Sequence, residues 1–191
     1  MPLQNTLRSS LTVYAVSQVD EFLRLIGEAP ESLAPAPVYD PYAVVLNQVL
    51  ELKNSEFEVL VGHLLTALGF EGSEVVGRTG DGGVDATGEL NIAGLAKVKV
   101  FVQAKRFKLG TRISATTVRS LRQAIPFGGQ GAFITTAEFQ PAAADVALEP
   151  GFPRIGLVNG RQLVDLLIQY WEAIPVEFRD KMGLKPGLVK A

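Results

Sequence analysis

A stretch rich in glycine and valine, from Gly80 to Arg106, most constrains how this chain can fold. It opens with the turn-forming run GDGG, continues through Val84-Asp85-Ala86 and ends in the alternating run AKVKVFVQAK. This pattern predicts two antiparallel strands that turn near Ala93-Gly94. Asp85 and Gln103 lie equally far from Gly94, so we expect them to face each other. In the second strand, side chains alternate between Val98, Val100, Val102 and Ala104 on one face and Lys99, Phe101, Gln103 and Lys105 on the other.

This hairpin therefore places a carboxylate, an amide oxygen and an ammonium group at one sheet edge, in Asp85, Gln103 and Lys105. Hydrolysis of a phosphodiester needs a nucleophilic water and relief of charge in the transition state, and a carboxylate-bound Mg²⁺ supplies both. Magnesium needs few protein ligands, and a nearby lysine can orient water or neutralise charge. Within GDGG, Asp81 is predicted to shape the turn, with metal binding as the alternative.

The rest of the chain predicts a mixed α/β sheet flanked by helices. Helical spacing indicates helices over 41–52 and 57–68, again around residues 118–125 after the polar stretch 109–117, and after residues 141 and 160. Strands are expected at 74–76, in the hairpin, at 131–136 and at 154–158. Alternation of strands and helices in the second half favours parallel strands, whereas the front half predicts an antiparallel meander. His63 is predicted to lie at the surface and Trp171 in the core.

Three segments are expected. Residues 1–40 form a short helical element and a proline-rich linker, residues 41–175 form the main domain, and residues 176–191 form a C-terminal tail. The 191 residues contain no cysteine, no apolar run long enough to cross a membrane and no secretory signal at the N-terminus. These features predict a cytoplasmic protein without a membrane partner.

Charge is distributed unevenly along the chain. The net charge is −2, yet residues 91–137 contain eight basic and no acidic residues, which leaves ten basic and all twenty acidic residues elsewhere. This asymmetry favours a polyanionic partner, with a solvated basic surface as the alternative. The candidates for contacts to backbone phosphates are Arg106, Lys108, Arg112, Arg119 and Arg122.

Several motifs in order resemble one known family. Phe57-Glu58, the run GDGGVD that ends at Asp85, and Gln103-Ala104-Lys105 are similar to the catalytic domain of the Mrr restriction endonucleases, a branch of the PD-(D/E)xK nucleases. Later pieces agree, namely TTAEF from Thr135 and LVNG from Leu157. The resemblance runs from about residue 54 to residue 171.

The resemblance implies a restriction-endonuclease-like fold and Mg²⁺-dependent cleavage of double-stranded DNA, with Mn²⁺ as a substitute metal and modified DNA as one option for the target. It makes Asp85 a metal ligand, Gln103 the residue in place of a second acid, and Lys105 the catalytic lysine. Glu58 is either a further metal ligand or the acid of a capping box with Ser55.

Two departures stand out. Compared with the wider PD-(D/E)xK superfamily, a glutamine at 103 offers the metal no negative charge, although glutamine is usual in the Mrr-like branch. Compared with the Mrr enzymes, some forty N-terminal residues are too few for the usual winged-helix domain. The alternatives are therefore an inactive DNA-binding module of the same fold and a junction-resolving or repair nuclease. Because cutting both strands needs two active sites, we expect a homodimer.

Overall fold

The computed structural model describes residues 40–75 and 83–184. The predicted helix and linker before residue 40, and the candidate turn residue Asp81, lie outside this part. Across the described residues, no helix is both long and apolar enough to cross a membrane.

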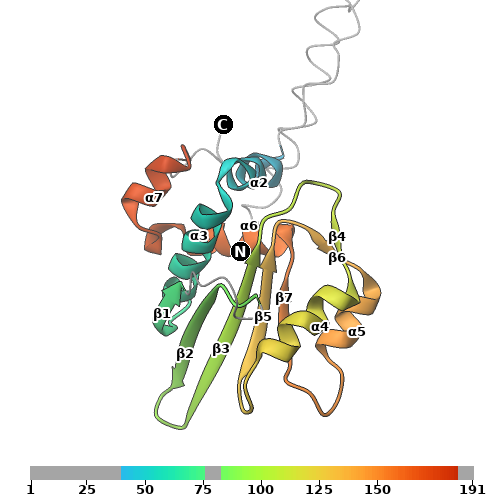
Figure 1. The fold of residues 1–191 in the computed structure, drawn as a ribbon. Coiled ribbons are helices and arrows are strands. Elements are labelled where there is room, and N and C mark those ends of the chain that lie inside the picture. The colour runs from blue at the N-terminus through green and yellow to red at the C-terminus, as the bar shows by residue number, and fades with distance from the viewer. Residues whose placement is uncertain (1–39, 76–82, 185–191) are drawn as a thin grey trace, which may run out of the picture. The chain divides into compact units, whose positions relative to one another are not determined.

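The centre of the fold is a five-stranded mixed sheet in the order β1-β2-β3-β5-β7 (Figure 1). The strands β1, β2 and β3 pair antiparallel, and β3, β5 and β7 pair parallel. This confirms the predicted combination of a meander with parallel crossover strands. The bounds are β1 Glu71–Val75, β2 Ala86–Ile92, β3 Ala96–Lys105, β5 Gln130–Thr135 and β7 Ile155–Val158.

The β2–β3 hairpin has the register that counting from Gly94 predicts. Ala86 pairs with Val102 and Ile92 pairs with Ala96, so the next position places Asp85 opposite Gln103. Ala93 and Gly94 turn the chain with positive φ angles of 48° and 77°. Two consecutive positive φ angles are typical of the tight turns whose twist matches that of paired strands.

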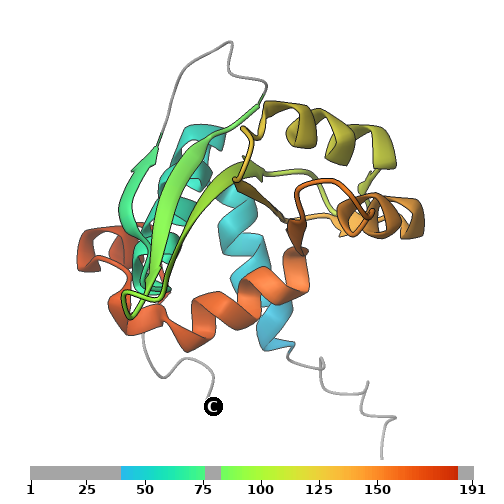
Figure 2. The same cartoon turned by 90° about the horizontal axis from the view of Figure 1, so that it is seen from below.

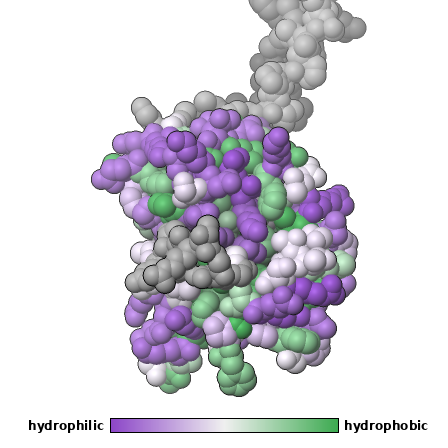
Figure 3. Space-filling view, viewed as in Figure 1, coloured by the Kyte–Doolittle hydropathy of each residue, from purple (hydrophilic) through white to green (hydrophobic). Residues whose placement is uncertain are grey.

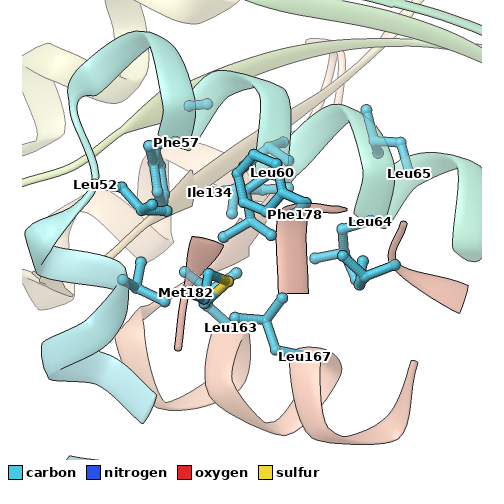
Figure 4. Close-up of a cluster of buried hydrophobic side chains, with 14 of the residues drawn as sticks. Leu52, Phe57, Leu60, Leu64, Leu65, Ile134, Leu163, Leu167, Phe178 and Met182 are labelled. Atoms are coloured by element: carbon cyan, nitrogen blue, oxygen red, sulfur yellow. The ribbon is translucent and has the colours of Figure 1, made fainter. Parts of the chain in front are cut away.

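Helices cover both faces of the sheet (Figures 1 and 2). One face carries α2 (Pro41–Glu51), α3 (Asn54–Ala67), α6 (Gly160–Gln169) and α7 (Val176–Lys181), and the other carries α4 (Ala115–Ala124) and α5 (Pro141–Ala147). The alternation along β3 explains this division, because Val102 and Ala104 pack with the first group and Phe101 packs with the second. The larger core is built around α3, where Phe57, Leu60 and Leu64 are fully buried (Figure 4).

The structure differs from the predictions at short or terminal elements. The two-residue strands β4 (Arg112–Ile113) and β6 (Glu138–Phe139) form a separate parallel pair; they are too short to show an alternating pattern. Residues 176–191 were expected to form a tail, yet they begin with α7. Phe178 of α7 and the adjacent Met182 are buried in the larger core, so apolar packing extends the folded unit beyond residue 175.

Candidate active site

A pocket of about 200 Å³ lies at the end of β3, beside the start of α3. It collects side chains from three parts of the chain: the first turns of α3, the loop before β2 and the last residues of β3. Of the four residues predicted to act on the substrate, Glu58, Asp85 and Lys105 line this pocket. The complete lining is Asn54, Glu58, Asp85, Ala104, Lys105, Arg106 and Phe107.

Asp85 is held by the neighbouring strand through both its backbone and its side chain. Its N–H donates to the carbonyl of Val102 at 2.8 Å, and its carboxylate accepts the N–H of Ala104 at 2.8 Å. Burial raises the pKa of Asp85, although the bond from Ala104 and the charge of Lys105 oppose that rise. The site thus holds a fixed carboxylate in a setting that disfavours its ionised form.

Glu58 is not the acid that caps α3. The helix begins at Asn54, and the N–H of Lys53 donates to the carboxylate of Glu56 at 2.7 Å. The capping acid is therefore Glu56, two residues before the predicted one, and the capping box of Ser55 with Glu58 is wrong. This leaves the carboxylate of Glu58 among the pocket residues. Burial, followed by the negative charge of Asp85, raises the pKa of Glu58.

Gln103 faces Asp85 in the hairpin register but does not belong to the pocket lining. Its side chain is only 2% exposed, and its Oε1 has no hydrogen-bond partner among the described residues. The amide lies against Gly83, where an added Cβ would come within 2.1 Å of Nε2. The expected gathering of Asp85, Gln103 and Lys105 is therefore met by two of the three side chains, and Gln103 packs beneath the turn that leads to Asp85.

Two threonines fix the end of β3 where Lys105 lies. Thr135 on β5 pairs in register with Lys105 and donates its hydroxyl to the Lys105 carbonyl at 2.6 Å. The hydroxyl of Thr136 bonds both the N–H and the carbonyl of Phe107 at 2.8 Å. Their role was not predicted from the pattern of the strand. The pairing of β3 with β5 explains it, because hydroxyls at the end of one parallel strand reach the backbone of the next.

Asn54 also lines the pocket, although it was not predicted as a site residue. It is the first residue of α3 and lies one turn before Glu58, so both lie on the same side of the helix. This i, i+4 spacing is the signal that could have identified it. The amide of Asn54 adds a neutral hydrogen-bonding group at the mouth of the pocket.

The five basic residues predicted to contact phosphates separate into two groups. Lys108, Arg112 and Arg119 are exposed. Arg122 is buried, forms an ion pair with Glu149 at 2.7 Å and also donates to the Val146 carbonyl. Arg122 was a candidate for phosphate contacts, but α5 and the loop after it cover that side of α4.

Arg106 lies between these groups. It lines the pocket and donates Nη1 to the carbonyl of Leu50 at 2.8 Å, close to the end of α2. At the other end of β3, the basic residue Lys97 pairs with Glu89 at 2.9 Å. Residues 91–137 contain eight basic side chains, but those of Lys97, Arg106 and Arg122 are engaged in contacts within the protein.

Figure 3 shows hydrophilic residues gathered at the end where α2 and α7 lie, whereas hydrophilic and apolar residues are mixed at the opposite end. The projecting apolar residues include Leu95 in the hairpin turn and Phe127 before β5, which are 88% and 107% exposed. The lining of the pocket at the end of β3 is mainly polar and charged, which suits a charged substrate.

His63 takes no part in this pocket. It lies on α3 and packs edge-on against Phe178 of α7, with ring centroids 5.4 Å apart. Burial lowers the pKa of His63, which favours its neutral form. His63 was predicted to lie at the surface, and its ring is instead partly covered by α7.

Comparisons with known proteins identify the family and the fold. The Mrr_cat family model, described as restriction endonuclease, matches residues 49–167. The type IV methyl-directed restriction enzyme EcoKMrr of Escherichia coli K12 is 37% identical over 133 residues, which cover 65% of this chain and 41% of that enzyme. This chain thus spans less than half the length of that relative.

Two solved structures share the fold. The DNA modification-dependent restriction endonuclease AspBHI superposes with a TM-score of 0.60 at 19% identity, over 82% of this chain and 44% of AspBHI. The MspJI restriction endonuclease in complex with a 27-mer oligonucleotide superposes with a TM-score of 0.58 at 21% identity, over 76% of this chain and 36% of MspJI. The chain therefore belongs to the Mrr_cat family of restriction endonucleases.

Proposed function

We propose that this chain cleaves double-stranded DNA in a reaction that depends on a divalent metal ion, with modified DNA as its target. The observation that carries the proposal is the convergence of Glu58, Asp85 and Lys105 on one pocket at the end of β3. The family match supports an endonuclease, and the names of EcoKMrr and AspBHI support action on methylated or otherwise modified DNA.

The donor set of the pocket fits a hard divalent cation. Asp85 and Glu58 present two carboxylates whose pKa values are raised by burial, and the charge of Asp85 also acts on Glu58. A cation between two such groups offsets the cost of their ionised forms. No cluster of three or more His, Cys, Asp or Glu occurs within residues 40–75 and 83–184. The two carboxylates of the pocket are enough for a metal that keeps several waters, as Mg²⁺ does.

In this proposal Asp85 and Glu58 would hold Mg²⁺, with Mn²⁺ as a substitute. When bound, the metal supplies Lewis-acid chemistry and lowers the pKa of water. Lys105 orients the attacking water and neutralises charge that develops on the phosphate. Its position is set by the bond of Thr135 to the Lys105 carbonyl. Gln103 acts from beneath the site, as a support for the turn at Gly83, and is not assigned as a ligand in this arrangement.

Binding of the DNA backbone is assigned to the exposed residues Lys108, Arg112 and Arg119, together with Arg106 at the pocket. Such contacts give affinity with little sequence discrimination. Recognition of the modified base is not assigned to any of the described residues. A cut through both strands needs two pockets, so we also propose that the active form is a homodimer, which sedimentation of the protein with and without DNA tests.

The proposal is tested by incubating methylated, unmethylated and branched DNA with the protein in Mg²⁺, Mn²⁺ or EDTA. Wild type is expected to cut methylated DNA in the presence of metal only. Asp85→Asn and Lys105→Ala are expected to bind DNA without cutting it. Lys97→Ala, at the other end of the same strand, is the matched control and should cut normally. DNA binding without metal-dependent cleavage by wild type would instead favour the inactive module, and a preference for branched DNA would favour a junction-resolving nuclease.

A further inference from the structure

The C-terminal helix α7 is tied to the helix turn that carries Glu58. We propose that Glu56 is a positioning residue, which α7 holds through Lys181, and that this contact sets the geometry of the metal-binding pocket. The inference rests on the proposed function of Glu58, and it assigns a role to a segment that lies beyond residues 49–167, where the family model matches.

A single carboxylate connects three pieces of the chain. One oxygen of Glu56 accepts the N–H of Lys53 at 2.7 Å, just before α3 begins. Its other oxygen pairs with Nζ of Lys181 at 2.6 Å. The side chain of Glu56 is 22% exposed and that of Lys181 is 51% exposed. The ion pair therefore lies at the surface, while the bond to Lys53 closes the helix start beneath it.

Apolar contacts hold α7 in place independently of this ion pair. Phe178 packs edge-on against His63 and is 9% exposed, and Met182 is 2% exposed (Figure 4). Glu56 and His63 are seven residues apart, which is two helical turns, so α7 follows one side of α3. Because the core already anchors α7, Lys181 is presented to Glu56 from a fixed support.

The other side of the same helix start forms the pocket. Asn54 and Glu58 line it, whereas Phe57 between them is fully buried in the core. The first N–H groups of any helix have no partner within the helix, and an unrestrained first turn frays. Fraying here would displace Asn54 and loosen Glu58. The contact between Glu56 and Lys181 opposes that motion, and α7 thereby acts on the pocket from outside it.

Two variants separate the ion pair from the cap. Glu56→Gln loses only the ion pair, because a glutamine can still accept the Lys53 N–H. Lys181→Ala also loses only the ion pair, whereas Glu56→Ala loses both the ion pair and the bond to Lys53. Lys181→Arg keeps the charge. The matched control is Glu172→Gln, which breaks the ion pair of Glu172 with Arg179 at 2.6 Å. That pair also involves α7 but does not reach α3.

The first measurement is hydrogen exchange of the Phe57 amide, which bonds the Lys53 carbonyl at 2.9 Å. Lys181→Ala and Glu56→Gln are expected to exchange about threefold faster than wild type, and Glu56→Ala about tenfold faster. The second is Ca²⁺ binding by calorimetry on the whole chain. We expect the affinity for Ca²⁺ to fall about threefold in Lys181→Ala and Glu56→Gln and about tenfold in Glu56→Ala. Loss of residues that support metal ligands typically lowers metal affinity by about 10- to 100-fold. Lys181→Arg and Glu172→Gln should match wild type in both.

Unchanged exchange of Phe57 in Lys181→Ala and Glu56→Gln would overturn the proposal. So would faster exchange with Ca²⁺ affinity equal to that of wild type, because the helix start would then move without affecting the pocket. Failure of the proposed function has a different signature. In that case wild type itself binds no Ca²⁺ and cuts no DNA with Mg²⁺, while the exchange data still report on the contact between α7 and α3.

Discussion

The close packing of Gln103 against Gly83 can be tested by replacing Gly83 with alanine. Gly83 has a φ angle of 93°, and a Cβ built on it would come within 2.1 Å of Nε2 of Gln103. Gly94 in the hairpin turn has a φ angle of 77° but nothing within 4 Å of the same position. Gly83→Ala and Gly94→Ala therefore share the backbone penalty and differ only in the collision with Gln103.

The magnitudes follow from these two terms. A left-handed backbone costs alanine about 1–2 kcal/mol, so this amount applies to both variants. At Gly83 the amide of Gln103 must also retreat by more than about 1 Å to reach ordinary contact. It must do so while only 2% exposed, and overpacking of an interior costs about 1–3 kcal/mol. We expect Gly83→Ala to lower the free energy of unfolding by about 2–5 kcal/mol and Gly94→Ala by about 1–2 kcal/mol.

Urea unfolding of both variants measures these values, provided that the slope with denaturant does not change. The collision is isolated by repeating Gly83→Ala in a Gln103→Ala background, where its cost should fall to that of Gly94→Ala. Equal destabilisation by Gly83→Ala in both backgrounds would refute the reasoning, because the penalty would then come from the backbone alone. The same result would remove the assigned support of the turn by Gln103.

Two further predictions concern charge. Burial, together with the charge of Asp85 on Glu58, raises the pKa of both carboxyl groups, so the folded state binds more protons than the unfolded state and is destabilised by these groups at neutral pH. In EDTA, the Asp85→Asn/Glu58→Gln variant should be more stable than wild type at neutral pH. Urea unfolding should show that the difference in free energy of unfolding disappears as pH falls through the folded and then the unfolded pKa values of the two carboxyl groups. A difference that does not change with pH would contradict this prediction. Arg122→Ala should lose about 1–3 kcal/mol of stability and keep its affinity for DNA. Arg119→Ala should stay within about 0.5 kcal/mol of wild type in stability and reduce the slope of log affinity for DNA against log salt by about 0.9. A loss of stability in Arg119→Ala and a reduced slope in Arg122→Ala would contradict the burial of Arg122.

The sheet and the hairpin register could be read from the sequence because both are set by local periodicity. Alternation along β3 and the turn at Gly94 are enough to place Asp85 opposite Gln103. The site was harder to predict, because facing positions in a register do not fix where long side chains end. Gln103 is drawn beneath the turn by the space at Gly83, and Asp85 is held by the backbone of Ala104.

Other features depend on contacts between distant segments. The capping acid is Glu56 because the N-cap of α3 is Lys53, two residues before Ser55, and a two-residue shift changes which acid meets the free N–H. Arg122 was a candidate for phosphate contacts, but α5 covers its side of α4. Its partner Glu149 lies 27 residues further along the chain, so the local sequence around Arg122 does not reveal this burial.

The double attachment of Asp85 to β3 makes the integrity of the site a local property. Its N–H and its carboxylate both bond backbone groups of the same two-residue step, at Val102 and Ala104. If the last rung of the hairpin opens, the aspartate leaves the lysine at the end of β3, while the remaining strands and helices stay folded. The proximity of the Asp85 carboxylate to Lys105 therefore depends on these two hydrogen bonds, and local opening of one strand end is enough to abolish it.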